Sequence, residues 1–430
     1  MKLNIIKKIL QALKFQVSSI TNNLLSSKLK ISQNKDNIKQ NSKRLVISYC
    51  FPPYVDTAGN VMAKRIRAME ERVDVIYNKM DRVRKVDPDL NLLVDDRISR
   101  RYEISSYSSF SNWKAISQFI KMGINEIDHV EYESIYSRVM WPASNFLAYE
   151  YKAKRPQTKW IAEFSDPILL DINGEIRKAE LGDKKFIKTA NELIAKKYGL
   201  PKVQDSNLFF WCEYLTYLFA DEIIFTNENQ YKYMMENFPI KEAVELVKSK
   251  ATISPQPFLE KKYYLLKESN YEIDKNKINL AYFGAFYSTR NLNELFLGLE
   301  ALSDKERNSI RLHIFTSDPH LLKTELIGSP VEQCIIVNPY VSFFEFLNLT
   351  LKFDCLIVND AETKSNKSIN PYLPSKLSDY LGSGNKVWGI YEEGSILSKA
   401  TINYNSRLGH INDTKKILKK LLIKSTNDNN

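Results

Sequence analysis

The sequence contains few of the residues from which metal sites and disulfide frameworks are built. It has only four histidines and four cysteines in 430 residues. None of them forms the H-x-x-x-H or C-x-x-C spacing that commonly holds zinc. The four cysteines are Cys50, Cys212, Cys334 and Cys355. Most of them lie in apolar runs, which favours free buried thiols in a reducing compartment. We therefore expect neither a bound metal nor structural disulfides.

Several motifs of other protein classes are also missing. The sequence has no G-x-S-x-G and no G-x-x-x-x-G-K-[ST] pattern, which lowers the expectation of hydrolase and P-loop chemistry. No apolar run reaches the roughly 18 residues that a membrane-spanning helix requires. Lys7, Lys8 and Lys14 interrupt the apolar N-terminus, so it does not resemble a signal peptide. We therefore expect a cytoplasmic protein.

Excess positive charge is scarce outside the N-terminus. The net charge is +11, and residues 1–43 hold nine lysines and one aspartate, so 44–430 carry only +3. This balance argues against a nucleic-acid partner, which needs a basic binding face. Residues 1–25 instead repeat apolar residues at helical spacing with lysines between them. Such a basic amphipathic helix can bind an anionic membrane surface or pack on its own protein or a subunit, and residues 26–43 read as a polar linker.

The rest of the chain alternates between strand-like and helix-like segments. Apolar runs predict strands at 44–50, 73–77, 134–139, 159–164, 222–226, 278–283, 310–315, 333–337, 353–358 and 387–390. This alternation predicts an α/β protein with parallel sheets covered by helices on both faces. We place one Rossmann-like domain at 44–255, a linker at 256–277, a second Rossmann-like domain at 278–411, and a C-terminal helix and tail at 412–430. Residues 171–205 are charged and irregular, and we read them as an insertion near the cleft.

The stretch 370–390, NPYLPSKLSDYLGSGNKVWGI, predicts a loop, a short helix and a buried strand. Ser375 and Lys376 mark the helix start, where backbone N–H groups and a lysine favour an anion. Asp379 follows one turn later, where it could reach a ribose hydroxyl while the other two face phosphate. Tyr380 belongs to the same helix and completes the candidate nucleotide-binding set. The alternative is an ordinary helix–loop–strand unit.

This stretch resembles the donor-site signature of GT-B glycosyltransferases, above all glycosyltransferase family 4, in which P-S-K-L-x-E-Y-L-x-x-G-x-P-V is common. Asp379 replaces the usual Glu, and Lys386 replaces the Pro. The resemblance covers most of 44–424, weakly in the first half. It implies two Rossmann-like domains that face each other across a cleft, with a nucleotide-diphosphate sugar bound mainly to the second. It also leads us to expect the C-terminal helix to return to the first domain.

A second loop, GAFYSTRN after the strand 278–283, adds to this resemblance. Gly284 allows close approach of the backbone, and the loop amides face an anion at the start of the next helix. Family 4 commonly has G-R-x-x-x-x-K here, and Arg290 falls on the Lys position while Ala285 takes the Arg position. An arginine binds phosphate in a bidentate manner. The alternative for Arg290 is a solvated loop side chain.

The first domain contributes weaker candidates. Gly59, in the loop FPPYVDTAGN, matches the glycine of a family 4 loop that faces the acceptor and the donor phosphates, or it marks a plain turn. Glu163 and Asp166 follow a strand in EFSDP, where ligands of an open parallel sheet bind, so they are candidates for an acceptor hydroxyl. Asp166 and Pro167 also keep the end of a D-x-R-D-P-like family segment. The alternative for Asp166 is a cap on the turn before that proline.

The resemblance implies a hexosyltransferase-like enzyme that retains the anomeric configuration and needs no metal or other cofactor. Arg290, Lys376 and Asp166 would be catalytic. Many family members also carry an E-x7-E pair, but Pro371 occupies the first acidic position, which leaves the donor sugar open. The acceptor would be a glycan or lipid-linked glycan of a bacterial envelope polysaccharide such as capsule or O-antigen, reached at the inner face of the membrane. The alternatives are a GT-B nucleotide-sugar epimerase and a non-catalytic two-domain sugar-binding protein.

Overall fold

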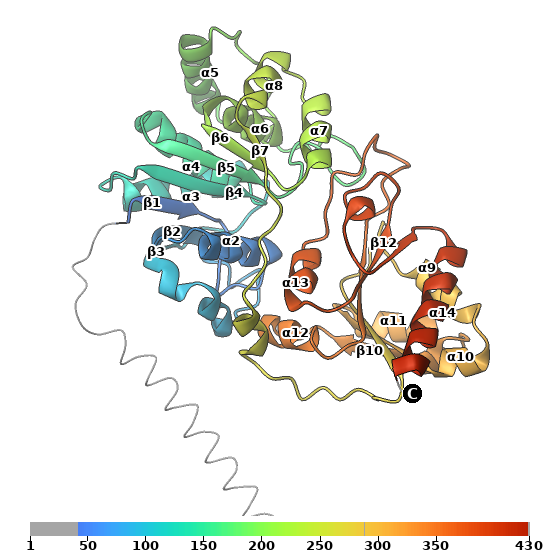
Figure 1. The fold of residues 1–430 in the computed structure, drawn as a ribbon. Helices are drawn as coiled ribbons and strands as arrows, with labels where there is room; N and C mark the ends of the chain where they lie inside the picture. The colour runs from blue at the N-terminus through green and yellow to red at the C-terminus, as the bar shows by residue number, and fades with distance from the viewer. Residues whose placement is uncertain (1–41, 288, 429–430) are drawn as a thin grey trace, which may run out of the picture. The chain divides into compact units, whose positions relative to one another are not determined.

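The computed structural model describes residues 42–287 and 289–428. The predicted amphipathic helix at 1–25 and almost all of the polar linker lie outside the described residues. Within the described part, no helix is long and apolar enough to cross a membrane. The described residues form one compact unit that contains two separate sheets (Figure 1).

The first sheet has seven parallel strands in the order β3-β2-β1-β4-β5-β6-β7. They are β1 (Arg44–Ile47), β2 (Val73–Asn78), β3 (Ile98–Ile104), β4 (Ser134–Val139), β5 (Lys159–Phe164), β6 (Glu222–Phe225) and β7 (Ala251–Ile253). The central strands are buried and mostly apolar, as expected for a parallel sheet covered on both faces. The strand order reverses between β1 and β4, so the loops after these two strands diverge and open a crevice at the carboxyl edge.

Seven α-helices accompany this sheet among the described residues: α2 (Thr57–Ala68), α3 (Trp113–Ile127), α4 (Ala143–Lys154), α5 (Lys184–Tyr198), α6 (Leu208–Phe219), α7 (Glu228–Asn237) and α8 (Lys241–Lys248). Helix α2 begins directly after the loop that follows β1. The Asp56 carboxylate caps it by accepting hydrogen bonds from the amides of Ala58 and Gly59. This cap fixes the start of α2 at the crevice.

The second sheet has six parallel strands in the order β10-β9-β8-β11-β12-β13. They are β8 (Ile278–Phe283), β9 (Ile310–Thr316), β10 (Ile335–Pro339), β11 (Cys355–Asn359), β12 (Val387–Tyr391) and β13 (Tyr404–Arg407). Its helices are α9 (Asn293–Glu300), α10 (Asp304–Asn308), α11 (Pro319–Leu326), α12 (Phe343–Leu349), α13 (Lys376–Ser383) and α14 (Ile411–Asp428). The order reverses between β8 and β11, and α13 begins at this second crevice. The predicted α/β class with two Rossmann-like sheets is confirmed.

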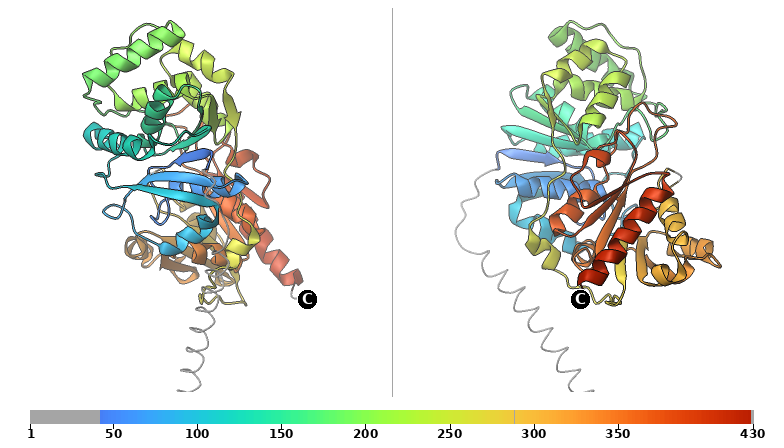
Figure 2. Two further views of the ribbon diagram at one scale, coloured as in Figure 1. Left: turned by 90° about the vertical axis from the view of Figure 1, so that its left-hand side faces the viewer. Right: turned by 45° about the vertical axis from the view of Figure 1, so that its right-hand side comes forward.

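The C-terminal helix does not return to the first domain as expected. Helix α14 packs against α9, β13 and β8 of its own domain (Figure 2). A Cβ added to Gly298 of α9 would lie 2.5 Å from Cγ2 of Thr414, so the two helices touch where α9 has no side chain. The basic amphipathic pattern of α14 therefore reflects a helix with one face on its own domain and the other in solvent.

Candidate functional site

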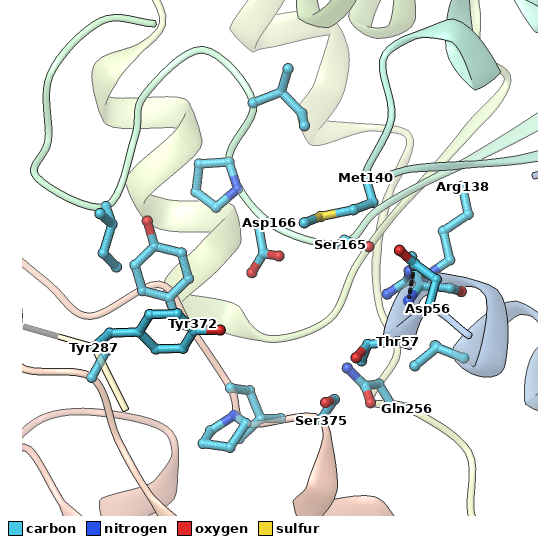
Figure 3. A pocket seen from close by; sticks show the side chains of 18 of the residues that line it. Asp56, Thr57, Arg138, Met140, Ser165, Asp166, Gln256, Tyr287, Tyr372 and Ser375 are labelled. Carbon is cyan, nitrogen blue, oxygen red and sulfur yellow. Dashed lines mark hydrogen bonds between the residues drawn. The ribbon is translucent and has the colours of Figure 1, made fainter. Parts of the chain in front are cut away.

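A cavity of about 740 Å³ lies where loops from the carboxyl ends of both sheets meet. Its polar lining includes residues of the first domain (Asp56, Thr57, Arg84, Arg138, Ser165, Asp166, Arg177), Gln256, and residues of the second domain (Tyr287, Thr289, Arg290, Tyr372, Ser375). We call it the large cavity, and Figure 3 shows ten of its residues labelled. Two smaller cavities of about 200 Å³ each lie next to it and share Thr57 and Ser375 with it. All three cavities are lined by residues of both domains.

Arg290 and Lys376 line one of the smaller cavities together, and we call it the cation cavity. The backbones of Tyr287 and Arg290 exchange two hydrogen bonds of 2.9 Å, which hold the turn after β8. The Nε of Arg290 is buried and has no hydrogen-bond partner among the described residues. The pKa of Lys376 is lowered, mainly by burial and also by Arg290, while Asp379 opposes the shift. Two cations with little compensation thus face one cavity, which suits an anion.

The structure also brings three further candidates to the cation cavity. Gly284 lines it directly after β8, where a Cβ would lie 2.6 Å from the hydroxyl of Tyr282. Ser375 lines all three cavities immediately before α13. Tyr380 lines the cation cavity from within α13 and is otherwise fully buried. Residues predicted from two separate stretches of sequence therefore meet in one place.

Asp379 lines the third cavity, which is mostly apolar and aromatic. Its carboxylate lies 2.7 Å from Nζ of Lys64, and both side chains are buried, with exposed fractions of 8% and 2%. Lys64 belongs to α2 and also donates to Oγ of Ser378 over 2.9 Å. Any ribose hydroxyl that reaches Asp379 would share this carboxylate with Lys64. Most of the other lining residues are aromatic or β-branched, including Tyr340, Val341, Phe343 and Phe346.

The prediction that Gly59 lies in a loop was wrong. Helix α2 begins at Thr57, so Gly59 lies in its first turn. A Cβ at this position would lie 3.1 Å from the carbonyl oxygen of Cys50 and 3.2 Å from Cα of Phe51. Glycine therefore lets α2 pack closely against the chain that leaves β1, which explains it without a phosphate.

The two acidic candidates of the first domain have different environments. Glu163 is completely buried and pairs with Arg65 and Arg138, so it cannot meet an acceptor. Asp166 points into the large cavity (Figure 3), and no described residue donates a hydrogen bond to its carboxylate. It therefore does not cap the turn before Pro167. Burial raises the pKa of Asp166, and three arginines only partly oppose this.

Arg290 was predicted from the sequence, but the other cavity arginines, Arg84, Arg138 and Arg177, were the main omission of the sequence interpretation. Arg138 lies near the end of β4, and a charge inside an otherwise buried strand was a usable signal. Arg84 and Arg177 come from charged loops and had no local pattern to single them out. Arg138, Arg177 and Arg290 all line the large cavity together with Asp166, and each lowers the pKa of the Asp166 carboxyl.

Asp360 follows β11 and is completely buried. Its Oδ2 accepts a hydrogen bond of 3.0 Å from the amide of Glu392. Burial raises the pKa of Asp360 from 3.8 to about 7, although Ser395, the Glu392 amide and Arg290 oppose the shift. The folded protein therefore holds a proton that the unfolded chain releases near pH 4.

We expect Asp360→Asn to remove a loss of stability that the parent protein suffers as the pH rises from 4 to 7. The folded-state pKa is raised, so the contribution of Asp360 is greatest below the unfolded pKa and is lost as the pH passes about 7. Asparagine does not titrate, and the variant should gain at least about 1 kcal/mol relative to the parent between pH 5 and pH 8. Urea unfolding of parent and variant at pH 5 and at pH 8 measures this difference in stability. The exposed Asp304→Asn change is the control, and a parallel pH response of Asp360→Asn and parent would contradict the assignment.

Within the described ranges, no group of three or more histidine, cysteine, aspartate or glutamate side chains is placed to hold a metal ion. All four cysteines are free and buried.

No protein-family model and no curated protein matches the sequence. Solved structures do match. Sucrose-phosphate synthase from Thermosynechococcus elongatus aligns with a TM-score of 0.57 and 11% identity over 89% of this chain and 90% of that one. The apo lipopolysaccharide outer core galactosyltransferase WaaB aligns with a TM-score of 0.52 and 11% identity over 89% and 90%. A structure described as trehalose-6-phosphate from E. coli bound with UDP-2-fluoro glucose gives 0.53 and 10% over 88% and 91%. These similarities establish a GT-B fold.

Proposed function

We propose that the protein is a glycosyltransferase that moves a hexosyl group from a nucleotide-diphosphate sugar to a glycan. The observation that carries this proposal is the shared cation cavity of Arg290 and Lys376. Their charges come from the turn after β8 and from the start of α13, and both can contact one diphosphate. The aromatic third cavity and Asp379 adjoin it through Ser375 and Lys376, where a nucleoside would extend.

The fold supports this assignment. Structures that share it include a galactosyltransferase and a protein bound with UDP-2-fluoro glucose. The large cavity opens beside the cation cavity, and Arg290 and Tyr287 line both. A donor held at the cation cavity would therefore present its sugar to the large cavity, where the acceptor binds.

In the proposed reaction, the acceptor hydroxyl oxygen bonds to the anomeric carbon as the bond from that carbon to the diphosphate oxygen breaks. The hydroxyl proton leaves with the departing diphosphate. Attack from the face that the diphosphate leaves retains the anomeric configuration. Arg290 and Lys376 stabilise the negative charge of the leaving group, so the reaction needs no metal. Asp166 accepts a hydrogen bond from the acceptor hydroxyl and orients it.

The acceptor we propose is a glycan or lipid-linked glycan of an envelope polysaccharide. The basic amphipathic sequence of residues 1–25 suits binding to an anionic membrane surface, where such acceptors are assembled.

Thermal unfolding with a panel of nucleotide sugars tests the donor site. We expect one of UDP-glucose, UDP-galactose, UDP-N-acetylglucosamine, GDP-mannose and ADP-glucose to stabilise the full chain by about 2.7 kcal/mol at a hundredfold excess over its dissociation constant. The matching free sugar should give no shift. Absence of a shift with every nucleotide sugar would reject the proposal. Interconversion of the bound sugar without any acceptor would identify an epimerase instead.

A further inference from the structure

The large cavity carries more positive charge than donor binding requires. Four arginines line it, Arg84, Arg138, Arg177 and Arg290, against two carboxylates, Asp56 and Asp166. Only Arg290 among these arginines also lines the cation cavity. The whole of 44–430 carries a net charge of only +3, so this local excess of two positive charges is a concentration of charge and not a general property of the surface.

The positive charge of two of these arginines is poorly compensated. Arg138 is buried, and its Nε lies 3.1 Å from Oε1 of Glu163, but Arg65 shares that carboxylate. Arg177 donates from Nε to the carbonyl oxygen of Ile168 over 3.1 Å, and no described carboxylate lies within ion-pair distance of it. Arg84 differs, since Asp56 pairs with it at 2.9 Å. Arg138 and Arg177 are therefore the two guanidinium groups of the first domain with charge left for a ligand.

The geometry around Asp166 places these two groups beside the acceptor. Asp166, Arg138 and Arg177 all line the large cavity, and only Arg290 among its arginines also lines the cation cavity. Its own carboxylate has no hydrogen-bond partner among the described residues and points into the cavity (Figure 3). Tyr287 and Tyr372 supply aromatic surface on the wall from the second domain. A ligand there would meet one acceptor of hydrogen bonds and two guanidinium groups.

We propose that Arg138 and Arg177 bind an oxyanion on the acceptor sugar, a phosphate monoester or a carboxylate, while Asp166 binds the hydroxyl that is glycosylated. This inference rests on the proposed function and names the substrate class of its acceptor side. Guanidinium groups bind both oxyanions through paired charge-assisted hydrogen bonds. A cavity of about 740 Å³ is large enough for a charged sugar. A neutral acceptor would bring no counter-charge to either guanidinium group.

The test measures binding of small acceptor probes to the full chain without a donor, at constant ionic strength. The probes are glucose, glucose 6-phosphate, glucuronate and inorganic phosphate, and calorimetry gives their affinities. We expect glucose 6-phosphate or glucuronate to bind at least about tenfold more tightly than glucose, since one charge-assisted pair is worth about that factor. The phosphate and carboxylate arms show which oxyanion the site prefers.

Arg177→Gln is the informative variant because Arg177, unlike Arg138, does not hold a buried carboxylate. It should weaken binding of the anionic sugar about tenfold and leave binding of glucose unchanged. Arg97→Gln, at an arginine that donates to the carbonyl of Glu70 outside the cavity, is the matched control. The inference is overturned if glucose binds as tightly as the anionic probes. It is also overturned if Arg290→Ala removes anion binding while Arg177→Gln does not, because the anion then occupies the donor site.

These outcomes are separate from failure of the proposed function. Loss of the nucleotide-sugar shift in the panel would reject the transferase. A retained nucleotide-sugar shift with no preference for anionic sugars would reject only the acceptor class.

Discussion

Arg290→Ala and Lys376→Ala should each reduce sugar transfer at least about a hundredfold while the protein stays folded. Removing one group that stabilises charge in a transition state commonly costs this much or more. The two side chains line one cavity from different turns, and each brings its own positive charge to it. We therefore expect that neither can replace the other. Neither makes an ion pair with a described carboxylate, and Asp379 keeps its pair with Lys64 when Lys376 is removed.

The kinetic pattern of these variants distinguishes two roles for the cations. If they stabilise the leaving diphosphate, kcat falls together with kcat/KM. If they only hold the donor, KM rises and kcat is preserved. Lys419→Ala, at an exposed lysine near Glu306, is the control and should retain activity. Full activity in both Arg290→Ala and Lys376→Ala would remove the donor-site assignment.

The sequence predicted the fold where the signal was local. The predicted strands at 134–139 and 159–164 match β4 and β5 to the residue, because a buried parallel strand is predominantly apolar. Strand β3, ISRRYEI, was missed because it lies at the sheet edge and alternates with charged residues. Helix α5 was missed because the charged segment 171–205 hides a helix with few buried residues.

The residues of the candidate site also divide into those with a local sequence signal and those without one. Gly284, Arg290, Ser375 and Lys376 could be found because each lies in a strand–loop–helix unit, and such units place their loops at the ligand edge of a sheet. Lys64 could not be found, since its partner Asp379 is 315 residues away and only the packing of α2 on α13 joins them. The pairing of Glu163 with two arginines likewise depends on strand register and not on spacing.

Glu163→Ala should lower the free energy of unfolding by about 3–5 kcal/mol, because it leaves two buried guanidinium groups without a counter-charge. The parallel register of β4 and β5 sets Arg138 opposite Glu163. Arg65 of α2 approaches the same carboxylate from 3.1 Å, and the hydroxyl of Tyr136 donates to it over 2.5 Å. Glu163 is fully buried, so water cannot replace any of these bonds. Urea denaturation at pH 7 measures the loss.

The effect should depend on pH in a defined direction. Burial alone would raise the pKa of Glu163, but Arg138, Arg65 and Tyr136 together outweigh it and lower the pKa below 4.5. Its contribution is therefore complete above the unfolded pKa and is lost as the pH falls through the lower folded value. Parent and Glu163→Ala should converge in acid. Glu222→Ala, which breaks an exposed pair with Lys159, should cost no more than about 1 kcal/mol. A similarly small loss for Glu163→Ala would contradict the role of this network.

A second substitution at Glu163 links stability to recognition. Glu163 accepts a hydrogen bond from Nε of Arg138, and Arg138 lines the same large cavity as Asp166. Glu163→Gln keeps the volume and part of the hydrogen bonding, so it should fold well enough for binding to be measured. Because the glutamine no longer fixes the guanidinium by charge, we expect weaker binding of anionic sugars with unchanged binding of glucose. Glu163 would then be a positioning residue that acts through Arg138, although it is completely buried and touches no ligand.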